Sequence, residues 1–245
     1  MFSLERKIGY SSLGANGKMR IGAVVDYLQD SSNFHLQSMH FLQEYFREND
    51  VGMYVVSRQL DIERLPRYGE DLVLNTFTHE CKNMYGFRNT LIYTQSKELC
   101  VKANTTGAFI NLKTAKPVKI PQNILEQIPI EPKFNMEYLP RKVKIPDIDA
   151  EKFDELKVRR YHIDSNRHIN NAKFLDIAED FLPEDYYYDC GNGGRSIKRV
   201  MIEYKSPASQ SDVIKPERYI YDNKVIIKLG GADENVTFAV IEFTY

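Results

Sequence analysis

The sequence contains one helix-like segment twice, at a fixed spacing of 150 residues. Ile21–Asp30 reads IGAVVDYLQD and Asn171–Asp180 reads NAKFLDIAED, and apolar residues recur at helical spacing in both. The aligned pairs are Val24 with Phe174, Val25 with Leu175, Asp26 with Asp176, Tyr27 with Ile177 and Asp30 with Asp180. Chance similarity between two amphipathic helices is the alternative explanation, so the flanking segments decide between the two.

The segments around the two helices also correspond. A short strand candidate precedes each helix, beginning at Ser3 in the first half and at Glu155 in the second. Four strand candidates follow each helix, separated by turn-forming residues. They cover 53–65, 70–81, 85–95 and 99–113 in the first half, and 196–207, 212–222, 224–230 and 236–245 in the second. Pro66 also aligns with Pro207, and Asp71 with Asp212. Agreement of helix, strand and turn signals favours a duplicated unit.

A proline-rich segment separates the two halves. Six of the ten prolines lie between Pro117 and Pro146, and this stretch shows no steady hydrophobic period. It predicts an extended connector along the surface, with a short helical turn at Asn123–Gln127. We therefore expect an N-terminal unit over residues 1–120, a linker over 121–150 and a C-terminal unit over 151–245.

One strand, one helix and then a run of antiparallel strands must bury the helix against the sheet. This order predicts the α+β class, with a curved antiparallel sheet wrapped around a central helix. That architecture is called a hotdog, and two copies in one chain make a tandem, or double, hotdog. Tandem copies can pair within the chain, and the sequence leaves open whether the protein also forms a homodimer.

Composition narrows the range of functions. A net charge of −1 provides no general basis for binding nucleic acid. The three cysteines, Cys81, Cys100 and Cys190, are widely spaced without a metal-binding pattern, so free thiols and a cytoplasmic location are expected. The N-terminus has no apolar signal segment, and no apolar run is long enough to span a membrane. We expect neither a metal nor a cofactor.

A polar cluster stands immediately before the second helix-like segment. Residues 164–171 read DSNRHINN, with Asp164, Asn166 and His168 at alternating positions. In an extended segment these three side chains would leave the backbone on one side. The helix N-terminus expected near Asn170 or Asn171 adds unpaired N–H groups and a positive dipole end that can stabilise an oxyanion. Histidine as a base, with a carboxylate partner and an amide that positions water, suits attack of water on an acyl group.

The alternative is that the cluster only shapes the backbone. Asn170 or Ser165 can cap the helix, and short polar residues before a helix often form a turn. The first half argues against a purely structural role. At the same spacing it has Gly14 in place of Asp164 and Lys18 in place of His168, whereas a purely structural loop should need the same residues in both copies.

The motif resembles that of the acyl-acyl carrier protein (acyl-ACP) thioesterases. These enzymes end fatty-acid synthesis by hydrolysing the carrier thioester. The family pattern Asp-x-Asn-x-His-[Val/Ile]-Asn-Asn-x-Lys-[Tyr/Phe] is matched here from Asp164 to Phe174. In the first half, the stretch from VVSRQL through PRYGED to YGFRNTLIY is similar to the family's Ser-Arg, Pro-x-[Trp/Tyr]-Gly-[Asp/Glu] and Arg-containing segments. The resemblance covers nearly the whole chain in order.

The resemblance implies a thioester hydrolase that acts on acyl-ACP, with catalytic Asp164, Asn166 and His168 and an acyl tunnel in the first half. Many plant members have a glutamate followed by a cysteine on a later strand, where this chain has Pro207 and Ala208. A cysteine nucleophile is therefore not supported there, and direct attack of water is expected. Glu203 or another carboxylate would have to replace the glutamate.

Two other functions stay open at this stage. An acyl-CoA thioesterase could share the architecture, and the missing glutamate would suit a non-catalytic acyl-binding protein. The aromatic residues Tyr27, Phe34 and Phe41 could line an acyl tunnel or belong to the helical core. Acyl carrier protein is acidic, so a positive patch could steer it by charge, and ordinary solvated surface is the alternative. The candidate residues are Lys113, Lys116 and Lys119 near the linker and Arg64 and Arg67 at a turn.

Overall fold

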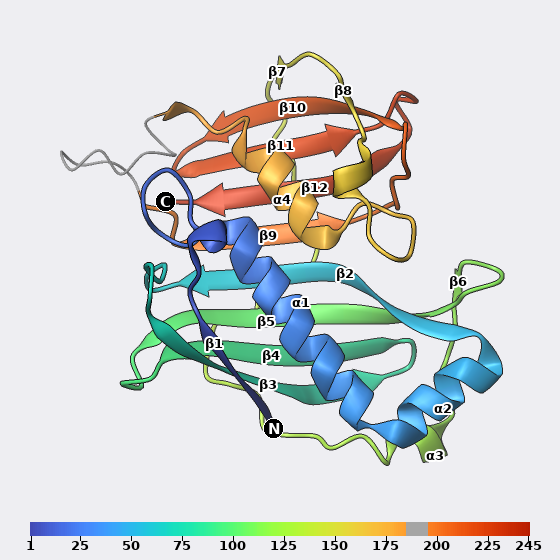
Figure 1. Cartoon of the computed structure of the whole chain (residues 1–245). Helices are drawn as coiled ribbons and strands as arrows, with labels where there is room; N and C mark the ends of the chain where they lie inside the picture. Colours follow the sequence, from blue (N-terminus) through green and yellow to red (C-terminus); the bar gives the residue numbers. More distant parts are fainter. Residues whose placement is uncertain (185–195) are drawn as a thin grey trace.

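The computed structural model describes residues 1–184 and 196–245, so Cys190 lies outside the described residues. Figure 1 shows two sheet-and-helix layers, one above the other, built on a single antiparallel sheet of 12 strands within the described chain. The helices are α1 (Ile21–Ser38), α2 (His40–Asn49), α3 (Gln122–Leu125) and α4 (Asn171–Glu179), with 3-10 turns η1 (Tyr10–Ser12) and η2 (Arg160–His162). We call β1–β6 with α1 and α2 the first unit, and β7–β12 with α4 the second unit.

The strands follow the repeat that the sequence predicts. Those of the first unit are β1 (Phe2–Lys7), β2 (Val51–Ile62), β3 (Asp71–Lys82), β4 (Tyr85–Thr94), β5 (Leu99–Asn111) and β6 (Lys116–Pro117). Those of the second are β7 (Glu151–Lys152), β8 (Leu156–Lys157), β9 (Arg199–Tyr204), β10 (Val213–Tyr221), β11 (Lys224–Gly230) and β12 (Thr237–Thr244). The order β1-β3-β4-β5-β2 of the first unit is matched by β7-β10-β11-β12-β9 in the second. The predicted α+β double hotdog is therefore confirmed.

Two equivalent edge strands join the units. Strand β2 pairs with β9 in antiparallel register from Ser57 opposite Glu203 to Asp61 opposite Arg199. The Arg199 Nε atom donates to Asp61 Oδ1 at 2.6 Å across this seam. Because each edge is paired with the other copy, neither edge exposes a ladder of unpaired backbone groups at the junction.

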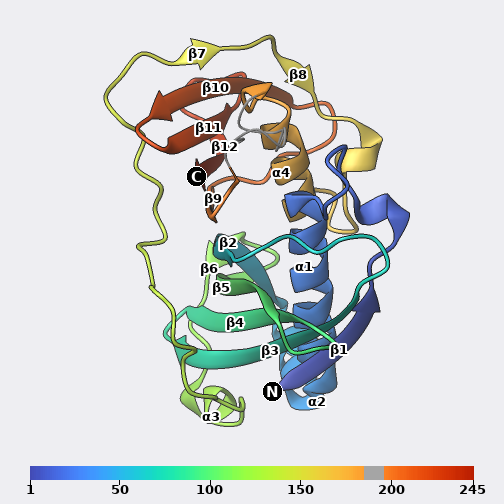
Figure 2. The same ribbon diagram turned by 90° about the vertical axis from the view of Figure 1, so that its left-hand side faces the viewer.

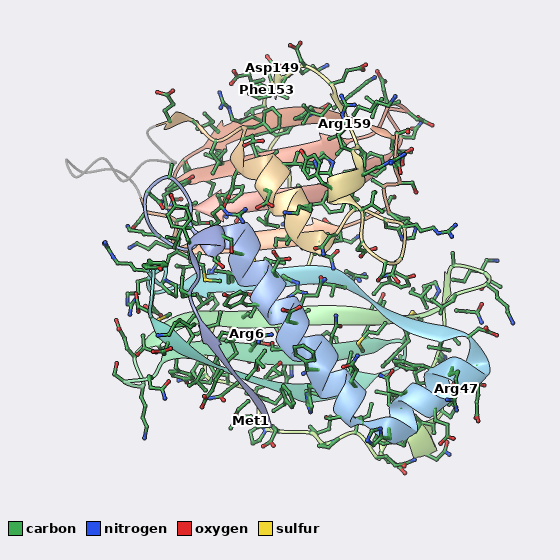
Figure 3. The ribbon with its side chains drawn as sticks, viewed as in Figure 1. Met1, Arg6, Arg47, Asp149, Phe153 and Arg159 are labelled. Carbon is green, nitrogen blue, oxygen red and sulfur yellow. The ribbon has the colours of Figure 1, made fainter. Side chains whose placement is uncertain are left out.

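The two long helices lie on the same face of the sheet and contact each other. Figure 1 shows α1 and α4 in front of the strands, and Figure 2 shows both on the same side of the sheet, with the N-terminal end of α1 beside α4. Their contact requires Gly22, because a Cβ atom there would lie 2.1 Å from Asp176 Oδ1. Asp176 is itself held by Arg20 and Lys173 at 2.8 and 2.7 Å. Buried apolar side chains of α1, α4 and the strands form one core cluster, and Figure 3 shows the side chains on the ribbon.

The linker lies on the opposite face of the sheet from the helices, as Figure 2 shows. Its backbone is fixed by polar side chains of the strands. Asn89 Oδ1 accepts from the Phe134 N–H at 3.1 Å, and Gln59 Oε1 accepts from the Leu139 N–H at 3.0 Å. Buried amides on the outer face thus replace the backbone pairing that an extended, proline-rich segment does not supply. The expected helical turn is present as α3.

Three details differ from the sequence prediction. The first helix extends beyond Asp30 to Ser38, and the strand before α4 is reduced to the two short pairs of β7 and β8. The second alignment is shifted by one residue. The backbone N–H of Ser209 bonds to Asp212 Oδ2 as that of Arg67 bonds to Glu70 Oε1, so Asp212 corresponds to Glu70 rather than to Asp71. Among the described helices, none is long and apolar enough to cross a membrane.

Candidate active site

The polar cluster before α4 forms a tight hairpin. Ile163 pairs with Ile169 in antiparallel fashion, and the Asp164 N–H donates to the His168 carbonyl oxygen at 2.9 Å. The turn closes with the Arg167 N–H on the Asp164 carbonyl at 3.0 Å, and Arg167 has a left-handed φ of 65°. The interpretation of Asp164, Asn166 and His168 as alternating residues assumed an extended segment. The segment is a hairpin, so that assumption is wrong.

The hairpin brings Asp164 and His168 together by another route. Residues directly opposite each other in an antiparallel pair place their side chains on the same face, with Cβ atoms about 5 Å apart. Asp164 Oδ1 accepts from the Asn166 backbone N–H at 2.8 Å, which fixes the turn, and the Asn166 side chain at its tip is exposed. Within the described residues, no side-chain hydrogen bond joins Asp164 to His168. Their catalytic roles stay predictions.

The first unit contains the same backbone without the same side chains. Leu13 pairs with Met19, the Gly14 N–H donates to the Lys18 carbonyl at 2.9 Å, and Gly17 has a φ of 71° where Arg167 has 65°. A loop of this shape therefore forms without an Asp at the first position or a His at the last. The loop shape alone therefore does not require Asp164 or His168 in the second unit.

The strand neighbour of His168 is the segment that contains Pro207 and Ala208, where the resemblance predicted a glutamate and a cysteine. His168 pairs with Ser209, and the Ile169 N–H donates to the Ala208 carbonyl at 2.8 Å. Ala208 is fully buried, so a methyl group stands where the cysteine would be. Glu203 is not the replacement for the glutamate, since its carboxylate accepts from the Val143 N–H of the linker, on the outer face of the sheet. Asp212 Oδ2 accepts a hydrogen bond from the Ser209 N–H and so caps the turn that begins there.

The N-terminus of α4 follows directly, as the sequence predicts. Asn170 is the cap residue, and its Oδ1 accepts from the Ala172 N–H at 2.9 Å. The Lys173 N–H is satisfied by the Asn170 carbonyl. Within residues 1–184 and 196–245, the Asn171 N–H donates to no backbone or side-chain acceptor. It is the amide that the positive end of the helix leaves available to an oxyanion.

Asn171 also joins the second unit to the first. Its side-chain Nδ2 donates to Gln29 Oε1 of α1 at 3.3 Å, and its carbonyl accepts from the Tyr204 hydroxyl at 3.3 Å. Burial raises the pKa of Tyr204 to about 12, so the hydroxyl is protonated and able to donate at neutral pH. The positive charge of the nearby Arg58 guanidinium on β2 opposes this rise in the pKa of Tyr204.

Gln29 lines a cavity of about 60 Å³ between α1, α2 and the inner face of the first unit. The residues from α1 lie on one helical stripe: Gln29, Ser32, Asn33 and Leu36. Apolar side chains that line the cavity include Met39, Leu42, Met53, Phe87, Phe109 and Ile128. The cavity thus combines apolar walls with polar residues such as Gln29 and Arg58, which meet the second unit.

A row of polar residues crosses the inner face of the sheet beside this cavity. Thr78, Arg88, Thr105, Arg58 and Ile202 are successive partners on β3, β4, β5, β2 and β9. Burial lowers the pKa of Arg88 to about 10, and Arg88 still donates to His35 Nδ1 at 2.7 Å. Arg58 is 1% exposed, and its Nε and Nη1 atoms have no hydrogen-bond partner within the described chain.

Sequence reasoning did not identify Gln29, Arg58 or Tyr204 as parts of the site. Arg58 carries a usable signal, because an arginine at an inward position of a strand is rarely fully buried. The aromatic set Tyr27, Phe34 and Phe41 does not line the cavity. Phe34 is 40% exposed and stacks under Arg6 instead, while Tyr27 packs on the core.

Two of the five basic residues expected to steer the partner, Arg64 and Lys113, form ion pairs within the chain. Arg64 forms ion pairs with Glu70 and Glu98 at 2.8 and 2.7 Å, and Lys113 pairs with Asp50. Charge at these positions therefore supplies little net attraction for an acidic partner.

These features define a double-hotdog protein. Each copy wraps a sheet around a helix, the two copies join edge to edge, and a polar hairpin precedes the second helix. Two solved structures share this fold over 99% of the chain and 96% of their own. They are an acyl-ACP thioesterase from Bacteroides thetaiotaomicron (TM-score 0.87, 16% identity) and a 12:0-ACP thioesterase from Umbellularia californica (TM-score 0.86, 16% identity).

Sequence comparison identifies the family. The model for the acyl-ACP thioesterase N-terminal domain matches residues 1–128, and that for the C-terminal domain matches residues 134–237. The chain belongs to the acyl-ACP thioesterase family. Its relatives include a chloroplast acyl-[acyl-carrier-protein] hydrolase, FATB2, from Cuphea viscosissima (26% identity, 70% of this chain and 45% of the relative). A dodecanoyl-[acyl-carrier-protein] hydrolase from Cinnamomum camphora is 22% identical over 83% of this chain and 55% of the relative. The chain spans about half the length of these curated relatives.

Proposed function

We propose that the protein hydrolyses the thioester of acyl-acyl carrier protein and releases a free fatty acid. The observation that supports this proposal is the contact between Asn171, which follows the polar hairpin, and Gln29, which lines the first-unit cavity. An acyl chain in that cavity would hold its thioester beside the α4 N-terminus. Membership of the acyl-ACP thioesterase family supports the same substrate class.

In the proposed reaction, His168 accepts a proton from a water molecule as the water oxygen attacks the thioester carbon. Asp164, opposite in the hairpin, favours the charged imidazole, and Asn166 positions the water. The Asn171 N–H stabilises the oxyanion of the tetrahedral intermediate. When the carbon–sulfur bond breaks, the imidazolium returns its proton to the leaving thiolate, giving a carboxylic acid and the carrier thiol. Ala208 offers no nucleophile, so no acyl-enzyme forms there.

The proposed partner is an acyl carrier protein whose phosphopantetheine arm delivers the thioester to the hairpin. An acyl-CoA presents the same thioester without the carrier protein. Comparing kcat/KM for one acyl group on each carrier tests the proposal. We expect hydrolysis of both to depend on His168, with a higher kcat/KM for the carrier-protein substrate. A preference for the CoA thioester would assign the protein to acyl-CoA hydrolysis.

A non-catalytic acyl-binding protein is the second candidate, and the absence of glutamate and cysteine at Pro207 and Ala208 favours it. Such a protein would bind an acyl-ACP tightly and leave the thioester intact. Following the free fatty acid and the carrier thiol together over many turnovers separates the two functions. Stoichiometric binding with no release of either product would contradict the proposed hydrolase.

A further inference from the structure

One side chain of the cavity lies over a strip of bare backbone. Gly86 on β4 and Gly107 on β5 are directly opposite each other on the inner face of the sheet. A Cβ atom added at Gly107 would lie 3.0 Å from both Cγ and Sδ of Met53, and one at Gly86 would lie 2.7 Å from Met53 Cε. The Met53 side chain of β2 therefore lies across both glycines and fills the space that their missing side chains leave.

Met53 also belongs to the apolar lining of the cavity. Gln29 and Arg58 line the cavity where the first unit meets the second, whereas the apolar Met53, Phe109 and Leu42 lie outside the β2–β9 pairing. A hydrocarbon chain gains nothing from guanidinium groups and gains about 0.8 kcal/mol for each methylene that it buries against apolar atoms. The chain end should therefore contact the apolar lining, where Met53 is the flexible side chain with glycine backbone beneath it.

The available length is short. On α1 the cavity extends from Gln29 to Leu36, which is two helical turns and a rise of about 10 Å. The cavity volume of about 60 Å³ also leaves little free space, so a bound chain must displace a movable group. Methionine, unbranched and with three rotatable bonds, is suited to such displacement, whereas the glycine backbone and the Phe109 ring are not.

We propose that Met53 determines the acyl-chain length, by forming the movable end wall of the pocket across Gly86 and Gly107. This inference rests on the proposed function, and it assigns the protein to acyl groups of medium length. Truncating Met53 opens the strip of glycine backbone and extends the pocket. Adding a methyl group at Gly107 pushes Met53 into the cavity and shortens it.

The test is a chain-length profile of kcat/KM on saturated acyl-ACP substrates of about eight to eighteen carbons. Met53→Ala should raise kcat/KM for chains two to four carbons longer than the wild-type optimum by about tenfold or more, relative to kcat/KM at that optimum. Burial of two methylenes corresponds to a factor of that size. Gly107→Ala should shift the optimum to shorter chains. Met201→Ala removes an equally large, buried side chain from the seam strand β9, outside the cavity lining, and should leave the profile unchanged.

The role of Met53 and the proposed hydrolase function can fail separately. If the wild-type protein hydrolyses acyl-ACP but Met53→Ala and Gly107→Ala keep its profile, Met53 does not set the chain length, while the hydrolase assignment stands. If the wild-type protein hydrolyses no chain, the proposed function fails first. Gly107→Ala removes no core contact, so it decides the question even where Met53→Ala folds poorly.

Discussion

The Asn171 side-chain amide of the second unit donates to Gln29 Oε1 of the first unit at 3.3 Å. Asn171 is the first residue of α4 and follows the hairpin that contains His168, whereas Gln29 lines the cavity beside α1. Under the proposed function, this hydrogen bond would join the catalytic hairpin of one copy to the acyl-binding cavity of the other. A duplicated hotdog can thus divide its work, with acyl binding in the first unit and hydrolysis in the second.

Replacing His168 with alanine should lower kcat on acyl-ACP by about 10²- to 10⁴-fold, because it removes the proposed general base. The fold should be retained, since the equivalent loop of the first unit forms with Lys18 at this position. His40→Ala is the matched control, because His40 is exposed and lies at the start of α2. Near wild-type turnover by the His168 variant, measured with the control, would eliminate the proposed mechanism.

Asp164 performs two tasks that substitution can separate. Asparagine at this position keeps an oxygen that accepts from the Asn166 N–H, so Asp164→Asn should keep the turn and its thermal stability. It lacks the negative charge beside His168, so kcat should fall by roughly tenfold or more. Alanine removes both functions and should also lower Tm. Equal turnover in the wild-type protein and the asparagine variant would show that Asp164 acts only through the turn.

The contact of the two helices predicts a cost for a single methyl group at Gly22. Gly22→Ala places Cβ against Asp176 Oδ1, which Arg20 and Lys173 hold in position, so the free energy of unfolding should fall by about 1–3 kcal/mol. Gly9→Ala is the control, because its added Cβ would meet only Ser11 Oγ at 3.9 Å. Chemical denaturation of both variants measures the difference. An unchanged midpoint for Gly22→Ala would mean that the helices do not pack this closely.

Glu179 at the end of α4 predicts a pH-dependent stability. Burial raises the pKa of its carboxyl to about 8, with the nearby Asp176 adding to the effect. Between about pH 4.5 and 8 the folded chain keeps this proton and the unfolded chain releases it, so stability should fall as pH rises. Glu179→Gln mimics the protonated form. The variant should therefore not show the decrease in the free energy of unfolding, on the order of a few kcal/mol, that the wild-type protein shows across that pH range. Parallel pH curves for the variant and wild-type proteins would show that Glu179 is ionised in the fold. The exposed Glu155→Gln serves as control.

The fold was predictable because its signal is long-range and redundant. Aligned helices such as 21–30 and 171–180, each followed by four strand candidates, specify a repeated unit whose helices must be buried. The exact boundaries were less accessible. Nothing local ends α1 at Asp30, and packing against the sheet extends it to Ser38. The one-residue shift that pairs Asp212 with Glu70 arises from turn geometry, with Gly69 and Ser211 both at left-handed φ.

The candidate site was predictable only in part. The motif from Asp164 to Asn171 is contiguous, so its residues could be named directly. Arg58, Tyr204 and Gln29 belong to different elements, and only the pairing of β2 with β9 and the contact of α1 with α4 bring them to the same place. The geometry within the hairpin could not be read from alternation, because Arg167 adopts a left-handed conformation that turns the chain back on itself.

The most direct test is the crystal structure of the His168→Ala protein with an acyl-ACP bound. We predict that the acyl chain enters beside Asn171, passes Gln29 and ends against Met53 in the first unit, with the thioester carbon at the hairpin. An acyl chain held within the second unit, or a thioester far from the α4 N-terminus, would contradict the division of work between the two copies.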